Sequence, residues 1–581
     1  MKLLSHSKKR LAVLLTLPAA AVLIAAVLLL PQSFSENKRF ETFTEDLFRS
    51  EVCSSTINLH YTLAEPASCD ISEYPITFGS VTSKDTAAYH ALLENHAAVL
   101  SSFQKDKLSK TNQLTLSILE QNCQAALDCP EAFYLQEPLS PSLGIQAQLP
   151  VLLAEYTFRS KQDVLDYLQL LKTLPEYFQQ ILSLEKEKSA KGLFMNDKAV
   201  DGVIAQCRSF IEHPDANYLL PVFNEKLKEL SSLTDEERSS CQTLHNKLIT
   251  SAVIPAYQQL IDGLTTLKGT GRNERGLSYY PGGRSYYTYL LRTQVGTEDS
   301  APVLEQRLYR QLTADSQEMQ EILKANPSLR FSSEDTVAQD IQEPSQILEQ
   351  LQNRMADDFP NLPDTAYEVK YVHEDLQEFL SPAFYLTPPV DTNSPNAIYI
   401  NPHSNMAGTE LFTTLAHEGF PGHLYQTIYF SETNPPLVRH LYSPGGYIEG
   451  WATYIESYAY TYADGSQDQN RLLWLNRSMN LCLYSLMDVG IHYHGWTEEQ
   501  NALFLARFGI TDSDTAAEIY EYILETPANY LKYYYGYLNF LDIRTACQEA
   551  EGSDFNLKEF HQKILELGPM PFSILREEML A

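Results

Sequence analysis

Apolar side chains recur at three- and four-residue steps along most of this chain, and this spacing restricts the fold more than any other feature. Between about residues 85 and 265 the recurrence puts apolar residues on one face of successive helices, as at Leu114, Ile118 and Leu119. Prolines separate these segments, because proline lacks a backbone donor and interrupts helices; they stand at Pro150, Pro175, Pro214 and Pro255. We therefore expect a mainly α-helical protein.

One stretch departs from the helical pattern. Residues 366–401 look extended, and the residues Val369, Tyr371 and Ala397–Ile400 predict a few short strands. The helical pattern returns at Glu410 and continues to the C-terminus. The sequence thus predicts a large helical domain with one small β-sheet beside the residues that carry chemistry.

The N-terminus carries an apolar run, Leu11–Leu30, directly after the basic residues Lys8, Lys9 and Arg10. About 20 apolar residues match the hydrocarbon core of a bilayer, and a basic flank favours the cytoplasmic side. We predict a single-pass anchor in the cell membrane, with the catalytic domain extracellular. A cleaved signal peptide followed by secretion is the alternative.

The predicted organisation has five parts. A basic cytoplasmic tail (1–10) precedes the anchor or signal segment (11–31), and a stretch with little periodicity (32–80) reads as a stalk or linker. A helical N-terminal part (81–270) then leads into a helical catalytic part (271–581). With 44% hydrophobic residues, the chain can bury a large core, so disorder is not expected.

The charge balance excludes one class of partner. The chain has 43 Lys and Arg against 74 Asp and Glu, for a formal net charge of -31. Because such a surface repels phosphate backbones, we expect no nucleic-acid binding. The same charge attracts cations, including basic peptides and divalent metals.

Eight cysteines fit an exported chain, and the absence of a C-x-x-C pair disfavours a zinc ribbon or a thioredoxin-like site. Disulfides between near neighbours, Cys53 with Cys69 and Cys123 with Cys129, are one expectation. Buried free thiols are the other.

The segment H-E-G-F-P-G-H carries the chemistry. A His-Glu pair followed by a second His is typical of zinc peptidases, in which two imidazoles bind the metal and the carboxylate takes a proton from water. His417 and His423 are six residues apart, about 600° around a regular helix, so an unbroken helix cannot aim both at one ion. Pro421 and Gly422 can bend the backbone and bring them together. Alternatively, the helix stops at Phe420 and the histidines are unrelated.

A third ligand follows in Y-I-E-G-W-A-T-Y-I-E. Glu449 lies 26 residues after His423, far enough for a second helix to return across the first. A carboxylate with two histidines leaves a fourth position on zinc open for water, whose proton Glu418 can accept. Glu456 lies near the same helical face as Glu449. One reading is that it orients a ligand, and the other, which we favour, is that it lies on the solvated surface.

Hydrolysis also needs donors for the developing oxyanion. In D-V-G-I-H-Y-H-G-W, Asp488 and His492 are four residues apart, so the carboxylate can orient the ring. Tyr533 is a second candidate donor. By spacing alone, both candidates are also consistent with ordinary core residues.

These motifs resemble the bacterial domain-of-unknown-function 885 family, whose hallmarks are H-E-x-x-P-G-H-x-x-Q and E-G-W-A. Further segments match in order, specifically after about residue 270; they are P-G-G-R-S-Y-Y, A-F-Y-L-T-P-P, D-V-G-I-H-Y-H-G-W, a P-x-x-x-x-x-Y-x-x-G segment ending at Arg544, and L-G-P-M-P. That family is similar to the gluzincin zinc peptidases, with the helical, channel-like build of oligopeptidases.

The resemblance implies one zinc ion held by three ligands, with Glu418 as the general base; the ligands are His417, His423 and Glu449. It also implies substrate or transition-state contacts from four residues, namely Tyr287, His492, Tyr533 and Arg544. Arg284 and Asn529 depart from the family pattern, which expects an acidic residue and a Gln there, and both departures bear on substrate preference.

The leading prediction is zinc-dependent hydrolysis of peptide bonds in short peptides. A carboxypeptidase or a dipeptidase requires a cation for the terminal carboxylate. Arg292, Lys532 and Arg544 are available, and the sequence does not select one of them. One rival is a non-catalytic surface protein that binds peptides or wall components. The other is a metallohydrolase of non-peptide amides or esters.

Overall fold

The computed structural model describes residues 35–581, except 84–85, 272, 274, 330–341, 363–364, 373, 375–376 and 378–380. The predicted anchor at 11–31 therefore lies outside the described residues. Within them, no helix is both long and apolar enough to cross a bilayer.

The described chain is mainly helical with one three-stranded sheet, which confirms that part of the predicted fold class. The N-terminal helices are α2 (Glu36–Val52), α3 (Thr56–Thr62), α4 (Thr86–Ser101), α5 (Lys110–Leu127), α6 (Ala132–Leu135), α7 (Ile145–Glu155), α8 (Lys161–Leu171), α9 (Leu174–Lys191), α10 (Asp197–Ile211), α11 (Leu219–Glu229), α12 (Asp235–Leu248) and α13 (Ile254–Leu267). The remaining helices are α14 (Gly283–Leu290), α15 (Ala301–Ala325), α16 (Pro344–Arg354), α17 (Gly408–Glu418), α18 (His423–Glu432), α19 (Gly445–Tyr462), α20 (Gln467–Val489), α21 (Glu498–Ala506), α22 (Ser513–Glu525), α23 (Asn529–Glu551), α24 (Leu557–Leu567) and α25 (Phe572–Leu580).

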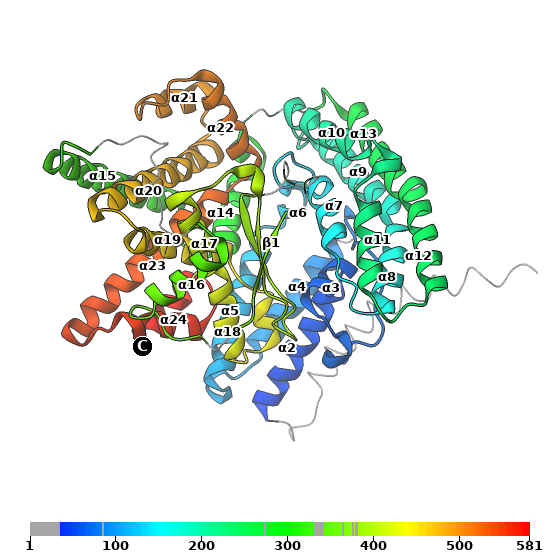
Figure 1. The fold of residues 1–581 in the computed structure, drawn as a ribbon, viewed down its shortest axis with the longest axis horizontal. Coiled ribbons are helices and arrows are strands. Elements are labelled where there is room, and N and C mark those ends of the chain that lie inside the picture. The colour runs from blue at the N-terminus through cyan, green and yellow to red at the C-terminus, as the bar shows by residue number, and fades with distance from the viewer. Residues whose placement is uncertain are drawn as a thin grey trace, which may run out of the picture.

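The predicted strands form a small mixed sheet in the order β1-β3-β2. The central strand β3 (Ala397–Ile400) pairs in parallel with β1 (Glu368–Tyr371) and antiparallel with β2 (Ala383–Leu386). Figure 1 shows the sheet between helices α8–α13 on one side and the C-terminal helices on the other.

Alternate residues of β3 join two hydrophobic cores. Ala397 and Tyr399 pack into the core formed mainly by α7–α13, whereas Ile398 and Ile400 pack into the larger core of the C-terminal helices. This division follows from the strand's period of two, which sends successive side chains to opposite faces. All four residues are buried. The sheet is thus the seam between the two helical parts.

The region predicted as a stalk is largely folded, which corrects that expectation. The first helix of the described residues, α2, buries Phe40 and Phe48 in a third core together with residues of α4, α5 and Val438. Ser35 caps this helix by accepting a hydrogen bond from the Lys38 amide. Phe40 and Phe48 lie on one face of α2, and burying them packs the segment against the rest of the domain.

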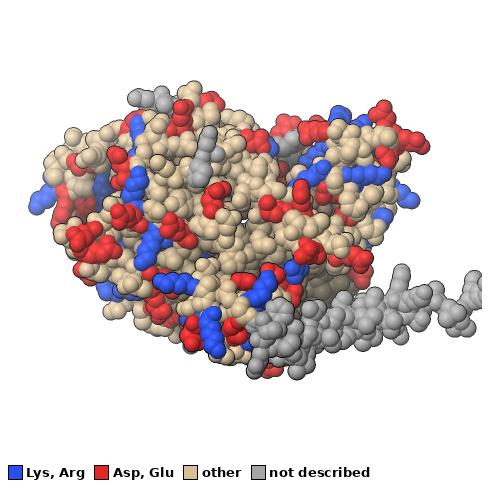
Figure 2. All heavy atoms as spheres, turned by 90° about the horizontal axis from the view of Figure 1, so that it is seen from below, with Lys and Arg blue, Asp and Glu red and all other residues tan. Residues whose placement is uncertain are grey.

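All eight cysteines are free, so neither predicted disulfide is formed. On the surface, carboxylate side chains are spread over both helical parts of the face shown in Figure 2, with fewer basic groups between them. This distribution matches the large negative charge of the sequence.

Candidate metal centre

The backbone breaks between the two histidines of H-E-G-F-P-G-H. Helix α17 ends at Glu418 and α18 begins at His423. The helix is therefore interrupted, as in the alternative in which it stops near Phe420. The intervening residues nevertheless turn the chain so that the rings of His417 and His423 meet edge to face, with centroids 4.7 Å apart. The interruption brings the histidines together instead of separating them.

Gly422 is required at this break. A Cβ atom there would lie 1.8 Å from the carbonyl oxygen of His417, which no side chain can occupy. The indole Nε1 of Trp451 donates to the carbonyl of Pro421 at 2.9 Å, which ties the break to helix α19. The sequence therefore fixes this turn with a glycine and with the Trp of the E-G-W-A motif.

Glu449 completes a cluster of three possible ligands with His417 and His423. Its Oε2 atom lies 3.5 Å from Nε2 of each histidine, and the ligand atoms are all within 4.8 Å of one another. Atoms that bind a tetrahedral zinc ion at about 2.0–2.1 Å are roughly 3.3–3.4 Å apart, close to the two 3.5 Å distances from Glu449. Glu449 Oε2 is buried and accepts no hydrogen bond from the described residues. The two imidazoles and the carboxylate, with Glu449 Oε2 left without a hydrogen bond among the described residues, fit a metal ion.

The position of Glu449 depends on how α19 meets α23. The two helices touch at glycine: a Cβ on Gly450 would lie 2.4 Å from the carbonyl carbon of Gly536. This close approach places Tyr533, one turn before Gly536, beside the cluster. Its ring lies nearly parallel to that of His417, with centroids 6.3 Å apart.

Glu456 does not lie on the solvated surface, which corrects the expectation from the sequence. It is buried, and its Oε1 is 2.8 Å from Nδ1 of His417. The guanidinium of Arg477 donates to both carboxylate oxygens, at 2.9 and 3.2 Å. Burial alone would raise the pKa of Glu456, but Arg477 and His417 outweigh it and lower the pKa to about 2.

The ionised Glu456 carboxylate can only accept hydrogen bonds, so Nδ1 of His417 must be the donor and carries the proton. The Nε2 atom of His417 is then the one that faces His423 and Glu449. A carboxylate behind a ligating histidine is the usual arrangement that fixes the ring and raises its basicity. Without a metal, burial disfavours the charged ring, but Glu449 and Glu456 raise the pKa of His417 to about 10.

Glu418 lies between the cluster and the sheet. The backbone amide of Tyr385 in β2 donates to Glu418 Oε2 at 2.8 Å. Burial raises the pKa of the Glu418 carboxyl, and the neighbouring Glu449 carboxylate acts in the same direction, while His417 and His423 oppose the shift. A carboxylate with a raised pKa, held beside a possible metal, suits proton transfer near neutral pH.

The structure does not bring His492 to this cluster. Its Nδ1 accepts from the Leu277 amide at 3.3 Å and its Nε2 donates to the Ile523 carbonyl at 2.9 Å. Burial lowers the pKa of His492 to about 4, so the ring is neutral. Since both nitrogens are engaged by backbone, His492 orders three segments and has no proton to offer a substrate.

The predicted pairing of Asp488 with His492 is also wrong. Asp488 instead accepts from the Tyr287 hydroxyl and from the Ala528 amide, the latter at 2.8 Å. Tyr287 is fully buried, so its expected contact with substrate is not available. The Asp488 carboxylate therefore joins helices α14, α20 and the start of α23.

Arg544 is placed away from the cluster as well. Its guanidinium donates to the hydroxyls of Tyr454 and Tyr458 and lies over the Tyr454 ring. None of the interactions of Arg544 among the described residues involves a residue of the cluster. The sequence around Arg544 does not reveal these contacts, because Tyr454 and Tyr458 belong to a different helix, α19.

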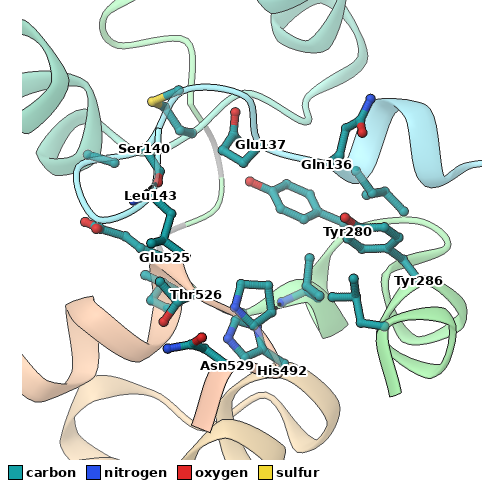
Figure 3. A pocket seen from close by; sticks show the side chains of 18 of the residues that line it. Gln136, Glu137, Ser140, Leu143, Tyr280, Tyr286, His492, Glu525, Thr526 and Asn529 are labelled. Atoms are coloured by element: carbon teal, nitrogen blue, oxygen red, sulfur yellow. Dashed lines mark hydrogen bonds between the residues drawn. The ribbon is translucent and has the colours of Figure 1, made fainter. Parts of the chain in front are cut away.

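A cavity of about 410 Å³ opens between the two helical parts, next to the first turn of α23. Figure 3 shows Gln136, Glu137 and Tyr280 on one side and Glu525, Thr526 and Asn529 on the other, with His492 at the base. Asn529, one of the departures from the family pattern, is thus in its wall. The sequence alone did not indicate this cavity, since its lining comes from segments up to about 400 residues apart, from Leu135 to Lys532.

The comparisons with known proteins agree on the fold. The structure is similar to a candidate lipoprotein from Colwellia psychrerythraea, with a TM-score of 0.84 and 20% identity, covering 94% of this chain and 99% of that chain. It is also similar to a candidate lipoprotein of unknown function from Shewanella oneidensis, with a TM-score of 0.65 and 17% identity, covering 93% and 100%. No curated protein matches the chain in sequence.

A family model also matches the sequence. The family described as "Bacterial protein of unknown function (DUF885)" matches residues 77–579, a span that includes the interrupted histidine pair, Glu449 and the sheet. The chain therefore belongs to the DUF885 family of bacterial proteins.

Proposed function

We propose that this protein is a zinc-dependent peptidase that hydrolyses short peptides. The observation that carries the proposal is the convergence of His417, His423 and Glu449 on one point, with Glu418 beside it and no hydrogen-bond donor from the described residues on Glu449 Oε2. Two histidines and one carboxylate form a donor set that zinc peptidases use, and it leaves a coordination position for a reactant.

A bound zinc ion would supply Lewis acidity, polarising the substrate carbonyl and making a water molecule acidic enough to lose a proton near neutral pH. Glu418 would take that proton and pass it to the departing amine. Glu456 holds His417 in the tautomer whose Nε2 is free for the metal. Burial and the nearby Glu449 raise the pKa of Tyr533 well above its ordinary value, so its hydroxyl remains a donor for the oxyanion.

The open edge of the sheet favours a peptide over other amides and esters. Strand β2 is an edge strand. The Asn401 amide donates to the Pro382 carbonyl at the start of β2. In an antiparallel pair only every second residue forms hydrogen bonds with the neighbouring strand, so Phe384 and Leu386 turn their backbone groups toward β3. Ala383 and Tyr385 consequently turn their backbone groups to the open edge, where the Tyr385 amide reaches Glu418. Because the Tyr385 amide already donates to Glu418, an extended peptide would pair with this edge through the backbone groups of Ala383 and the carbonyl of Tyr385, and so present a bond to the cluster.

The location proposed for the protein is the cell envelope. The apolar run Leu11–Leu30 after a basic flank is suited to anchoring the chain, and two proteins of similar fold are described as candidate lipoproteins. The catalytic part would then face the extracellular side, where short peptides are accessible.

The test is peptide profiling of the purified protein with and without a chelator. We expect cleavage products from a mixed peptide library, their loss on chelation and their return on adding zinc. Parallel incubations with ester and wall-fragment substrates test the rival proposal of a non-peptide hydrolase. Faster turnover of these substrates than of peptides would favour that rival. Peptide binding without turnover at full zinc occupancy would favour the non-catalytic rival.

A further inference from the structure

The cavity next to the first turn of α23 is lined by the basic residue Lys532. Among the described residues, no ion pair or hydrogen bond reaches the ammonium group of Lys532, although the side chain is only partly exposed and lines the cavity. The other cation of the lining, Arg275, is exposed and donates to the hydroxyl of Tyr279, over whose ring it also lies. Lys532 is the basic group that is available to a ligand.

Lys532 lies close to the metal centre. It directly precedes Tyr533, whose ring faces His417. Its side-chain stem packs over Gly445, where a Cβ would lie 2.6 Å from Lys532 Cδ. Gly445 stands four residues before Glu449 on α19, one turn or about 6 Å along the helix. The stem of Lys532 therefore contacts α19 one helical turn before Glu449.

The acidic groups of the cavity are already engaged. Glu137 forms an ion pair with the buried Lys188 at 2.5 Å, and Glu525 accepts from the hydroxyl of Ser142. Asp488, behind the first turn of α23, accepts from Tyr287 and Ala528. Burial lowers the pKa of Lys532, while Glu449 and Asp488 oppose that shift. Because the acidic groups are engaged by other residues, Lys532 is the charged group of the cavity wall that can bind an anionic part of a substrate.

The two other cations considered for a terminal carboxylate are both occupied elsewhere. Arg292 forms ion pairs with Asp128 at 2.7 Å and Glu298 at 3.0 Å. The Arg544 guanidinium is held by two tyrosine hydroxyls. Neither lines the cavity.

We propose that Lys532 binds the terminal carboxylate of the substrate, so that the C-terminal end of a peptide occupies the cavity and the enzyme acts as a carboxypeptidase. The inference rests on the proposed peptidase function and adds the substrate class. A cavity of about 410 Å³ accommodates a small ligand of this kind. One end of the peptide would lie in the cavity, while the β2 edge holds the residues before the scissile bond.

The test compares a pentapeptide of alanine and phenylalanine that has a free C-terminus with the same peptide as its C-terminal amide. We expect the enzyme to shorten the free acid from its C-terminus, as read by mass spectrometry, and to turn over the amide roughly ten- to hundredfold more slowly, the usual range for losing a hydrogen bond to a charged group. Lys532→Met should remove this difference by raising KM for the free acid, and Lys532→Arg should restore part of it.

A matched control and a binding measurement complete the test. Lys198→Met, which removes an exposed lysine outside the cavity, should keep the preference for the free acid. Calorimetry on the Glu418→Gln variant measures binding without turnover, and the free acid should bind tighter than the amide only when Lys532 is present. An amidated peptide that ends in glutamate separates a side-chain carboxylate from a terminal one, and its efficient cleavage would overturn the assignment.

The outcomes separate this inference from the proposed function. Cleavage of acid and amide at equal rates would overturn the role of Lys532 and leave a zinc-dependent endopeptidase. If neither peptide is cleaved by the zinc-loaded protein and the calorimetric preference for the acid is also missing, both proposals fail. Binding that favours the acid without any cleavage would retain the carboxylate site and remove the peptidase activity.

Discussion

Gly450 of α19 lies directly against Gly536 of α23, close enough that a Cβ on Gly450 would be 2.4 Å from the carbonyl carbon of Gly536. Glu449 directly precedes Gly450, and Tyr533 precedes Gly536 by three residues. The glycine contact therefore sets the separation between the third ligand of the candidate metal centre and the proposed oxyanion donor. It gives a packing reason for the glycine in the E-G-W-A motif.

Gly450→Ala should push these helices apart. We expect a loss of about 1–3 kcal/mol of stability, typical of an overpacked contact, together with weaker zinc binding because Glu449 moves. Thermal unfolding in the presence of chelator isolates the packing cost, and a competition titration measures the zinc affinity. An unchanged melting temperature and affinity would show that α19 and α23 do not touch at this glycine.

Glu456→Gln should weaken zinc binding without removing a ligand. Gln keeps the shape of the side chain but loses the charge that holds the Nδ1 proton of His417, so we expect about 10- to 100-fold lower affinity. Zinc competition with a chromogenic chelator is the measurement. Glu432→Gln, a change on the exposed end of α18, should bind zinc as the unmodified protein does. Equal affinity in both variants would mean that Glu456 has no influence on His417.

Glu418→Gln and Glu449→Ala should separate catalysis from metal binding. The first variant should retain about one zinc per chain and lose roughly 10²- to 10⁴-fold in turnover, the usual contribution of a general base. The second should lose zinc, because two histidines alone hold it weakly. Metal analysis and peptide turnover are measured on the same samples. Undiminished cleavage by Glu418→Gln would remove that residue from its role, and full zinc in Glu449→Ala would place the third ligand elsewhere.

Asp488 should make the protein less stable as the pH rises toward neutrality. Burial raises its pKa to about 7 in the folded state, although hydrogen bonds from Tyr287 and Ala528 oppose this. Between the unfolded pKa of about 3.9 and the folded value, the folded state binds more protons, so the free energy of unfolding falls with increasing pH. From pH 5.5 to 7 the loss is about 1.5 kcal/mol, because the slope of 1.36 kcal/mol per pH unit falls to half as the pH reaches the folded pKa.

The measurement is denaturant unfolding from pH 5.5 to 8, above the sequence pI of about 4.8. Asp488→Asn removes this titration, so its stability should change less over that range than that of the unmodified protein. Other acidic groups contribute equally to both proteins and cancel in the comparison. Parallel curves for the two proteins would show that Asp488 is already ionised at pH 5.5.

The helical class and the small sheet were predictable because both follow from local spacing. A step of three or four residues determines which side chains share a helix face, whatever lies around the helix. The convergence of His417, His423 and Glu449 was predicted on similar grounds. The number of residues between the histidines requires a break, and Pro421 with Gly422 supplies it. Their role as metal ligands stays a prediction.

The errors concern residues whose surroundings come from distant segments. The ring of His492 is held by Leu277 and Ile523, which spacing around His492 does not reveal. Glu456 looked like a surface carboxylate because its partner Arg477 belongs to the next helix. The supposed stalk carries aromatic residues that pack against α4 and α5.

By itself, the sequence determined the helical fold class, the break between the two histidines and the small set of residues able to hold a metal. The tertiary structure decided how the polar groups are paired. It buried Tyr287 against the Asp488 carboxylate and His492 against two backbone groups, and among the described residues it gave Lys532, in the cavity wall, no hydrogen bond or ion pair. The physical reason is that local spacing orients a side chain on its own element. Burial and pairing depend on segments that only the packed fold brings together.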